Sequence, residues 1–281
     1  MISSLYMVFE FIISLGSGAC GALLGLGGGV LLVPLLVFLL GVPIQFASGA
    51  SIVAVVATSS VAASTYVREE LTNMRLGMFL ELATTLGAVS GAFLTAMTSE
   101  SMLKTVFGIS LLYAAAIMFL QQRRESRSWV QRPNDRLSER LSLGGRYYDA
   151  ARDEEITYGV GRTPLTFGVS YVAGVVSGLL GIGGGGVKVP AMNVLSGVPM
   201  KVAVATSNFM IGVTAAASAL VYIRHQYVDA FITAPVMLGT LIGAYIGSRL
   251  TRRIRGVVLK NFFIVVLSLL AARMILSGLG V

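Results

Sequence analysis

The chain has 281 residues, of which 55% are hydrophobic and only 12% are charged. Soluble domains carry about 25% charged residues, so this composition excludes an ordinary soluble fold. The net charge of +8 does not indicate nucleic-acid binding, because nine arginines are interleaved with seven acids in residues 122–163 and most other basic residues flank apolar stretches. We therefore expect a multi-pass protein of the inner (plasma) membrane that contacts lipid and no nucleic acid.

Few residues suited to metal or redox chemistry are present. Cys20 is the only cysteine and His225 the only histidine. A single cysteine excludes an internal disulfide and a cysteine-based metal cluster, and one histidine alone makes no metal site, so we expect no cofactor. A G-x-x-x-x-G-K-[ST] nucleotide loop does not occur, which argues against ATP as the energy source within this chain. The segment MISSLYMVFEF lacks Lys and Arg, so no cleavable signal peptide is expected.

The first half begins with an apolar stretch from about residue 5 to 40 that is interrupted by glycines at 25–29. Apolar spans follow near 46–66, 78–96 and 103–121, each long enough to cross about 30 Å of hydrocarbon. Residues 122–163 come next, and charged residues recur there without a clear apolar face. We expect this segment to be a soluble cytoplasmic linker that is at most partly helical.

The second half repeats the first. Its broken apolar stretch covers about 165–195, and spans follow near 202–223, 232–248 and 261–279. Residues 25–34 read GLGGGVLLVP and residues 181–190 read GIGGGGVKVP, with six of ten positions identical at an offset of 156. The same offset, without a gap, pairs Gly41-Val42-Pro43 with Gly197-Val198-Pro199, Ser51 with Ser207, Tyr66 with Tyr222, and Gly87 and Gly91 with Gly243 and Gly247.

A match of this length indicates duplication, and two equivalent halves around a shared site are a common plan of transporters. The predicted organisation is a first transmembrane repeat at 1–121, the linker at 122–163 and a second transmembrane repeat at 164–281. The fold class is an all-α polytopic membrane protein, in which each repeat is a glycine-broken helical hairpin followed by three transmembrane helices.

The charges favour an inverted arrangement of the two repeats. If each broken stretch enters and leaves on one side, then of 21 Lys and Arg 17 lie inside, three lie outside and Lys188 lies on neither side; the three are Lys104, Arg224 and Arg273. If each broken stretch crosses once, the repeats are parallel and 13 lie inside against seven outside. The positive-inside rule prefers the first arrangement. Both termini then lie outside.

The glycine runs are the first candidates for the functional site. Glycine lets the backbone leave helical geometry and approach a ligand, and two broken hairpins meeting near the midplane would aim helix N-termini at one point, which suits an anion. Close packing of helices through small residues would give a similar pattern. The candidate residues are Gly27, Gly28, Gly29, Gly183, Gly184 and Gly185. Residues 181–186 also fit G-x-G-x-x-G, but the preceding soluble strand and later acid of a dinucleotide site are missing.

Lys188 follows the second glycine run at the place where the first repeat has Leu32. A lysine in an apolar stretch costs about 2.5–3.5 kcal/mol on insertion scales and is a functional candidate by default. The alternative is a side chain that reaches an interface. Further anion-binding candidates are polar residues early in equivalent spans, which could instead bond between helices or to backbone. These candidates are Ser48, Ser51, Asn193, Thr206, Ser207 and Asn208.

Two acids, Glu10 and Glu81, lie closest to the apolar segments. Glu81 has no acidic counterpart, since Met237 occupies the equivalent position. It lies three residues into its expected span, so we expect an interfacial position, with a role in proton coupling as the weaker alternative.

The segments GLGGGVLLVPLLVFLLGVP and ASGAS, then GIGGGGVKVP and GVPMKVAVATSNF, resemble the TauE/SafE family of membrane proteins. The resemblance covers both hydrophobic halves, and the linker lies outside the pattern. It implies export of sulfite, sulfoacetate or related sulfur-containing organic anions.

The sequence therefore predicts a secondary transporter of a small anion that works by alternating access between the repeats. A passive anion channel is the closest alternative, and a membrane scaffold whose linker recruits partners is a further one. An intramembrane enzyme is not expected, because the spans hold no cluster of acids and His225 falls in a loop.

Overall fold

The computed structural model describes residues 2–24, 28–124, 132–149, 153–250 and 256–280, and most of them are helical. The first repeat contains α1 (Ile2–Leu24), α2 (Gly29–Leu40), α3 (Ile44–Arg68), α4 (Met74–Met97) and α5 (Glu100–Arg124). The linker contains α6 (Arg136–Arg140), β1 (Gly145–Asp149) and β2 (Glu154–Tyr158). The second repeat contains α7 (Thr163–Leu180), α8 (Gly185–Pro190), the π-helix η1 (Ala191–Leu195), α9 (Met200–Arg224), α10 (Ala230–Leu250) and α11 (Gly256–Leu279).

Six of the described helices are long and apolar enough to cross a membrane, namely α3, α4, α5, α7, α9 and α10. Shorter apolar helical segments lie in α1, α2 and α11. Together they confirm the expected all-α polytopic membrane protein. The duplication is also visible in the helix starts, because α9, α10 and α11 begin at positions equivalent to the starts of α3, α4 and α5.

Equivalent interfaces join the two repeats. Helix α1 packs along α10, and α7 packs along α4. A Cβ on Gly87 of α4 would lie 2.2 Å from the Tyr171 carbonyl oxygen, and one on Gly243 of α10 would lie 2.1 Å from that of Leu15. Tyr171 and Leu15 are themselves equivalent at the offset of 156. These glycines therefore serve close backbone packing between helices, and they do so in the same way in both interfaces.

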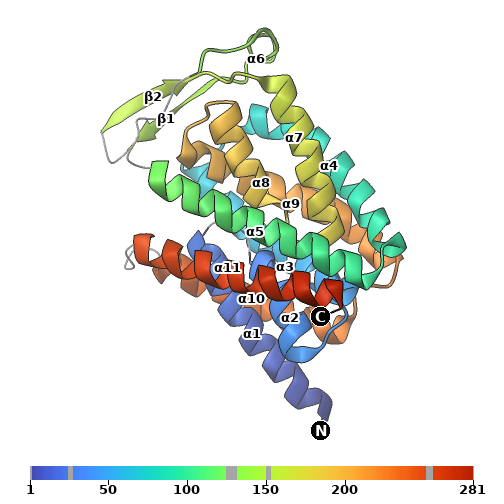
Figure 1. The fold of residues 1–281 in the computed structure, drawn as a ribbon. Coiled ribbons are helices and arrows are strands. Elements are labelled where there is room, and N and C mark those ends of the chain that lie inside the picture. The colour runs from blue at the N-terminus through green and yellow to red at the C-terminus, as the bar shows by residue number, and fades with distance from the viewer. Residues whose placement is uncertain (1, 25–27, 125–131, 150–152, 251–255, 281) are drawn as a thin grey trace.

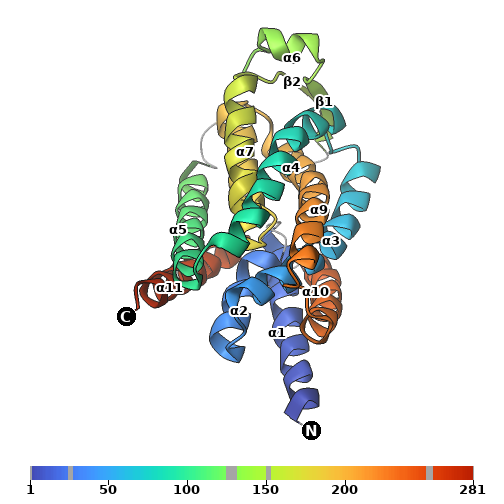
Figure 2. The ribbon, with the colours of Figure 1, turned by 90° about the vertical axis from the view of Figure 1, so that its right-hand side faces the viewer.

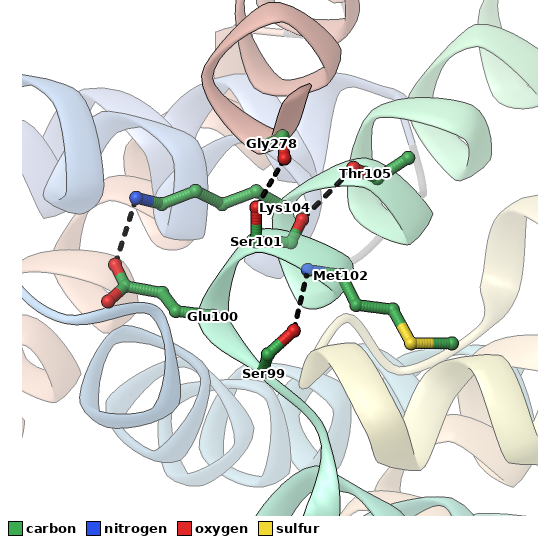
Figure 3. Close-up of polar contacts among 7 residues, drawn as sticks. All are labelled: Ser99, Glu100, Ser101, Met102, Lys104, Thr105 and Gly278. Carbon is green, nitrogen blue, oxygen red and sulfur yellow. Dashed lines mark hydrogen bonds and ion pairs between the residues drawn. The ribbon is translucent and has the colours of Figure 1, made fainter. Parts of the chain in front are cut away.

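The remaining long helices also pair across the repeats, α3 with α9 and α5 with α11. Figure 3 shows how the start of α5 is fastened to the end of α11, where the Ser101 hydroxyl donates to the Gly278 carbonyl. Beside it, Lys104 forms an ion pair of 2.9 Å with Glu100, one helical turn earlier. The long helices therefore pack in pairs, with one helix of each pair from each repeat.

The directions of the first helices differ between the repeats. Figures 1 and 2 show α1 running from the N-terminal end of the molecule to its middle, and α7 running from the opposite end, beside the linker, to the middle. The helix after each glycine break also differs. Helix α2 runs unbroken for 12 residues, whereas α8 has six residues and passes directly into η1. A π-helical turn inside a membrane helix is often found at functional sites.

The described part of the linker, residues 132–149 and 153–162, is folded and packs on the helices. Strands β1 and β2 form an antiparallel hairpin in which Gly145 pairs with Tyr158. Apolar linker side chains, including Leu143, Tyr158 and Val160, pack in one buried cluster with Leu76 of α4 and with residues of η1 and α9. The short helix α6 agrees with a partly helical linker, whereas the hairpin and its buried apolar side were not expected from the sequence. This end of the molecule lies opposite the N-terminus (Figure 1).

Two side chains tie the linker to the ends of helices. Asn73 accepts a bond from the Leu76 N–H at the start of α4, and its side-chain amide donates to the Leu143 carbonyl at 2.8 Å. The Asp135 carboxylate accepts bonds from the N–H groups of Ser138 in α6 and Thr163 in α7, at 2.7 and 2.5 Å. Burial alone raises the pKa of Asp135, but these hydrogen bonds outweigh it and lower the pKa below its ordinary value.

Replacing Asp135 with alanine should loosen the linker, because two helix starts lose their cap. We expect a loss of about 1 kcal/mol, typical of an N-cap. The lowered pKa means that the contribution is present above the ordinary aspartate pKa of about 4 and is lost as the pH falls through the folded value. Limited proteolysis of the linker should therefore be faster in Asp135→Ala than in wild type at neutral pH, and the difference should shrink in acid. Glu139→Ala, at an exposed position of α6, is the control. Equal proteolysis of Asp135→Ala and the control would contradict the capping role.

Candidate functional site

Lys188 is buried inside the protein. Its side chain is 1% exposed, and its ammonium donates a hydrogen bond of 2.8 Å to the hydroxyl of Thr214 in α9. A side chain that reached the interface would not be enclosed in this way, so the interfacial alternative for Lys188 is wrong. The Lys188 backbone N–H bonds to the carbonyl of Gly184, which ties the position of the lysine to the end of the glycine run.

The hydroxyl of Thr214 connects Lys188 to a carboxylate. Thr214 donates to Glu81 Oε1 of α4 at 2.7 Å, and Glu81 also accepts bonds from Thr84 at 2.9 Å and Thr85 at 2.8 Å. Lys188 and Glu81 attract each other across this one hydroxyl. The resulting chain, Lys188–Thr214–Glu81, joins helices of both repeats, and we call it the buried charge relay.

Glu81 lies deeper within its helix than the expected span placed it. Helix α4 begins at Met74, earlier than the span expected from residue 78, so Glu81 lies about two turns inside the helix. Its side chain is 7% exposed and holds three hydroxyl donors. The sequence contains a signal for this cluster, since Thr84 and Thr85 follow Glu81 at the i+3 and i+4 spacing that shares one helix face. Thr214, 133 residues away, had no such signal.

The ammonium of Lys188 has donors to spare. A lysine carries three N–H donors, and within the described residues Thr214 is the one hydrogen-bond acceptor that the structure gives to it. Buried donors without acceptors are costly, about 1–3 kcal/mol each and more when charged. The site therefore combines a buried positive charge with unused donors, which is the chemistry that an anion satisfies.

The glycine breaks of the two repeats meet beside α3. The Ser51 hydroxyl donates to the Gly181 carbonyl at 2.9 Å. A Cβ on Gly29 would lie 2.6 Å from the Ser51 oxygen and 3.2 Å from the Gly181 carbonyl oxygen. Ser48 is buried, and its carbonyl lies against Gly181. The structure thus brings Gly29, Ser48 and Ser51 together with the start of the second glycine break. Residue 29 must be small because it packs closely against Ser51 and the Gly181 carbonyl.

The individual glycines differ in what they require. Gly183 and Gly184 have φ of +76° and +70°, a left-handed backbone that favours glycine. Gly28 lacks this conformation, and a Cβ there would meet its nearest atom at an ordinary 3.4 Å. Gly184 and Gly185 lie at the start of α8, whose six residues give it only a small dipole. Gly27 lies outside the described residues.

Several predicted anion ligands bond to the protein backbone instead. Thr206 accepts from the Asn73 N–H at 3.0 Å, Asn208 donates to the Val204 carbonyl at 3.0 Å, and Asn193 donates to the Val198 carbonyl at 2.9 Å. Ser207 is buried, and its hydroxyl has no partner among the described residues. Its counterpart Ser51 bonds to Gly181, and the position equivalent to Gly181 is Gly25, which lies outside those residues. Among the described residues, none of these four shares a hydrogen bond with Lys188.

The site is closed. Val55 and Ile211, equivalent residues of α3 and α9, both lie against Gly183 and close the space between the breaks. A cavity of about 20 Å³ beside Gly184 and Gly186 has room for a single water molecule. A larger hollow of about 220 Å³ lies between the loop before α4 and the linker hairpin, remote from the relay. Lys188 itself is 1% exposed, so among the described residues it offers little surface to an anion in this conformation.

Comparisons with known proteins agree on a membrane transporter. Residues 10–274 match the family described as "Sulfite exporter TauE/SafE". The "Probable membrane transporter protein YunE" of Bacillus subtilis (strain 168) is 26% identical over 282 residues, covering 97% of this chain and 99% of the relative. A "Probable membrane transporter protein" of Xylella fastidiosa (strain 9a5c) is 28% identical over 250 residues, covering 87% of this chain and 86% of the relative. No solved structure matches the chain.

The family match spans both repeats and the linker between them, which together make up most of the chain. The six long apolar helices, the duplicated glycine breaks and the named relatives point to one kind of protein. The chain belongs to the Sulfite exporter TauE/SafE family and is a multi-pass membrane transporter protein of that family.

Proposed function

We propose that this protein is a secondary transporter of a small anion and that Lys188 is its anion-binding group. The observation that carries the proposal is the buried ammonium with a single acceptor. In a poorly hydrated site the attraction between an ammonium and an anion is several times stronger than in water. An arriving anion would fill the unused donors of Lys188 and offset the desolvation of its charge.

The substrate class follows from the family. Its description names a sulfite exporter, and sulfite, sulfoacetate and related sulfonates present oxygen acceptors that suit an ammonium. A small oxyanion would also need less separation of the helices than a large organic molecule, since the cavity described beside Gly184 and Gly186 is only about 20 Å³. We therefore infer a sulfur-containing oxyanion or organic sulfonate as the transported species, across the inner (plasma) membrane.

Inverted repeats supply a mechanism of alternating access. Three observations support inversion: the unequal charge partition of the loops, the opposite courses of α1 and α7, and the matched interfaces of α1 with α10 and α4 with α7. Rocking of one set of helices against the other would expose Lys188 first to one side and then to the other. The packing of Val55 and Ile211 against the second glycine break suits the occluded state of such a carrier.

Neutralising Lys188 should remove substrate binding while the protein still folds. Lys188→Met keeps most of the side-chain length and removes the charge. We therefore expect uptake of sulfoacetate or sulfite into proteoliposomes to fall at least tenfold, because the variant inserts into the membrane but binds its substrate less tightly. Leu32→Met, at the equivalent buried position of the first repeat, is the matched control and should transport normally. Unchanged uptake by Lys188→Met, with the control equally active, would rule out the lysine as the anion site.

The inverted topology makes a separate prediction about two loops. Gln226 between α9 and α10 and Ser142 in the linker are both exposed and can be replaced by cysteine in a Cys20→Ser background. Inverted repeats place the two on opposite sides of the membrane, whereas parallel repeats place them on the same side. A membrane-impermeant maleimide added to intact cells should label Gln226→Cys and leave Ser142→Cys unlabelled until the cells are opened. Labelling of both from one side would contradict inversion.

A further inference from the structure

A second buried charge lies beside the proposed anion site. Glu81 is separated from the Lys188 ammonium by the hydroxyl of Thr214, and both side chains are enclosed by protein. With the carboxylate ionised, the pair carries no net charge, which is why two ions can be buried together. An anion that binds Lys188 disturbs this balance, because it adds a negative charge close to Glu81.

We propose that Glu81 carries the proton that couples anion movement to the proton gradient. This inference rests on the proposed anion site at Lys188. When the anion binds, it replaces Thr214 and Glu81 as the partner of the Lys188 ammonium. The Glu81 carboxylate then takes up one proton from the water on the side of the membrane from which the anion entered. When the anion leaves on the other side, the O–H bond of Glu81 breaks and the proton leaves with it. One proton therefore moves with each anion.

Repulsion between the anion and an ionised Glu81 drives the uptake. Two like charges in a site of low dielectric constant disfavour each other strongly, and a carboxylate can relieve the repulsion by protonation. The hydroxyls around Glu81 accommodate both states. Thr84, Thr85 and Thr214 donate to the carboxylate, and each can instead accept a bond from the protonated acid because a hydroxyl is both donor and acceptor.

Other charged groups around Glu81 do not compete for this role. Helix α4 packs against α7, α9 and the linker. Helix α7 contributes one titratable side chain, Tyr171, which is 41% exposed. Helix α9 carries Lys201 and Arg224 near its two ends, with Tyr222 bonded to Thr95 near the far end of α4.

On the linker side, burial raises the pKa of Tyr158 to about 12, so it stays neutral. Arg75, on α4 itself, is exposed. Lys188 is thus the charge that faces Glu81.

The internal repeat shows that the relay occurs once. Thr58 and Thr240 occupy the positions equivalent to Thr214 and Thr84, but Leu32 and Met237 replace the two charged residues. Thr58 and Thr240 bond to carbonyls of their own helices. Two of the three hydroxyls are therefore duplicated, since Leu241 stands at the position equivalent to Thr85, and the charges are not duplicated, which gives one anion site and one proton site per chain.

The test is the pH dependence of sulfoacetate binding to the purified protein. Sulfoacetate does not itself titrate between about pH 6 and 8. Because binding takes up one proton, we expect the affinity of wild type to fall about tenfold for each pH unit of increase. Glu81→Gln keeps the shape of the side chain, with its amide nitrogen donating to a threonine hydroxyl where a carboxylate oxygen accepted, and it cannot take up a proton, so its affinity should lose this slope. Glu10→Gln, which alters another buried acid, is the matched control and should keep the slope of wild type.

A slope retained by Glu81→Gln, or lost in Glu10→Gln, would overturn the proposal for Glu81. Wild-type binding that is independent of pH would do the same while leaving the anion site intact. Failure of wild type to bind or transport any sulfonate or sulfur oxyanion would instead contradict the proposed function. If Glu81→Gln does not fold, wild-type vesicles loaded with a pH dye give the answer: sulfoacetate entry should acidify the lumen, and entry without acidification contradicts coupling.

Discussion

The hydrogen bonds from Lys188 to Thr214 and from Thr214 to Glu81 connect three helices of two repeats through one hydroxyl. An ammonium buried among membrane helices is unfavourable unless an opposite charge or an anion compensates it. In this structure Glu81 provides the opposite charge, and only the Thr214 hydroxyl stands between it and the Lys188 ammonium. Three threonine hydroxyls donate to the Glu81 carboxylate and hold it in place. Val55 and Ile211 pack against the glycine break beside the relay, and both charged side chains are buried, so these interactions act in an environment of low dielectric constant.

The helix pairs of the two repeats form a symmetric frame, whereas the buried charged residues of the relay have no counterparts at the equivalent positions. Equivalent glycines, among them Gly87 and Gly243, allow equivalent helix pairs to approach closely in both interfaces. In the proposed mechanism this frame rocks between two related arrangements of similar energy, because the contacts on the two sides are alike. The relay, the short α8 and η1 break that likeness on one side only. We infer that the symmetric frame permits the motion and that the single charged site decides what is moved.

Much of the helical framework could be predicted from the sequence, but little of the buried charge relay could. Hydropathy predicted the spans, and the repeat at an offset of 156 residues predicted the matching halves. Both signals lie in the sequence itself and need no knowledge of tertiary contacts. Lys188 stood out as a charge in an apolar stretch. Its partners did not, because Thr214 and Glu81 come from helices that meet only in the folded chain. Hydroxyl and amide side chains such as Thr206, Asn193 and Asn208 looked like ligands, yet they bond to backbone groups whose positions depend on tertiary packing. The linker hairpin was missed for a similar reason, since its apolar residues find their partners on α4, η1 and α9.

Thermal unfolding of Lys188→Met, Glu81→Gln and the double variant tests the buried charge relay most directly. Each single change leaves one buried charge without its partner, and breaking a buried pair in this way costs about 3–5 kcal/mol. The double change removes both charges and leaves a neutral site of similar shape. The account predicts that the double variant recovers most of the stability lost by either single variant, which is a strongly non-additive cycle. Losses that simply add in the double variant would show that Lys188 and Glu81 do not compensate each other and would contradict the relay.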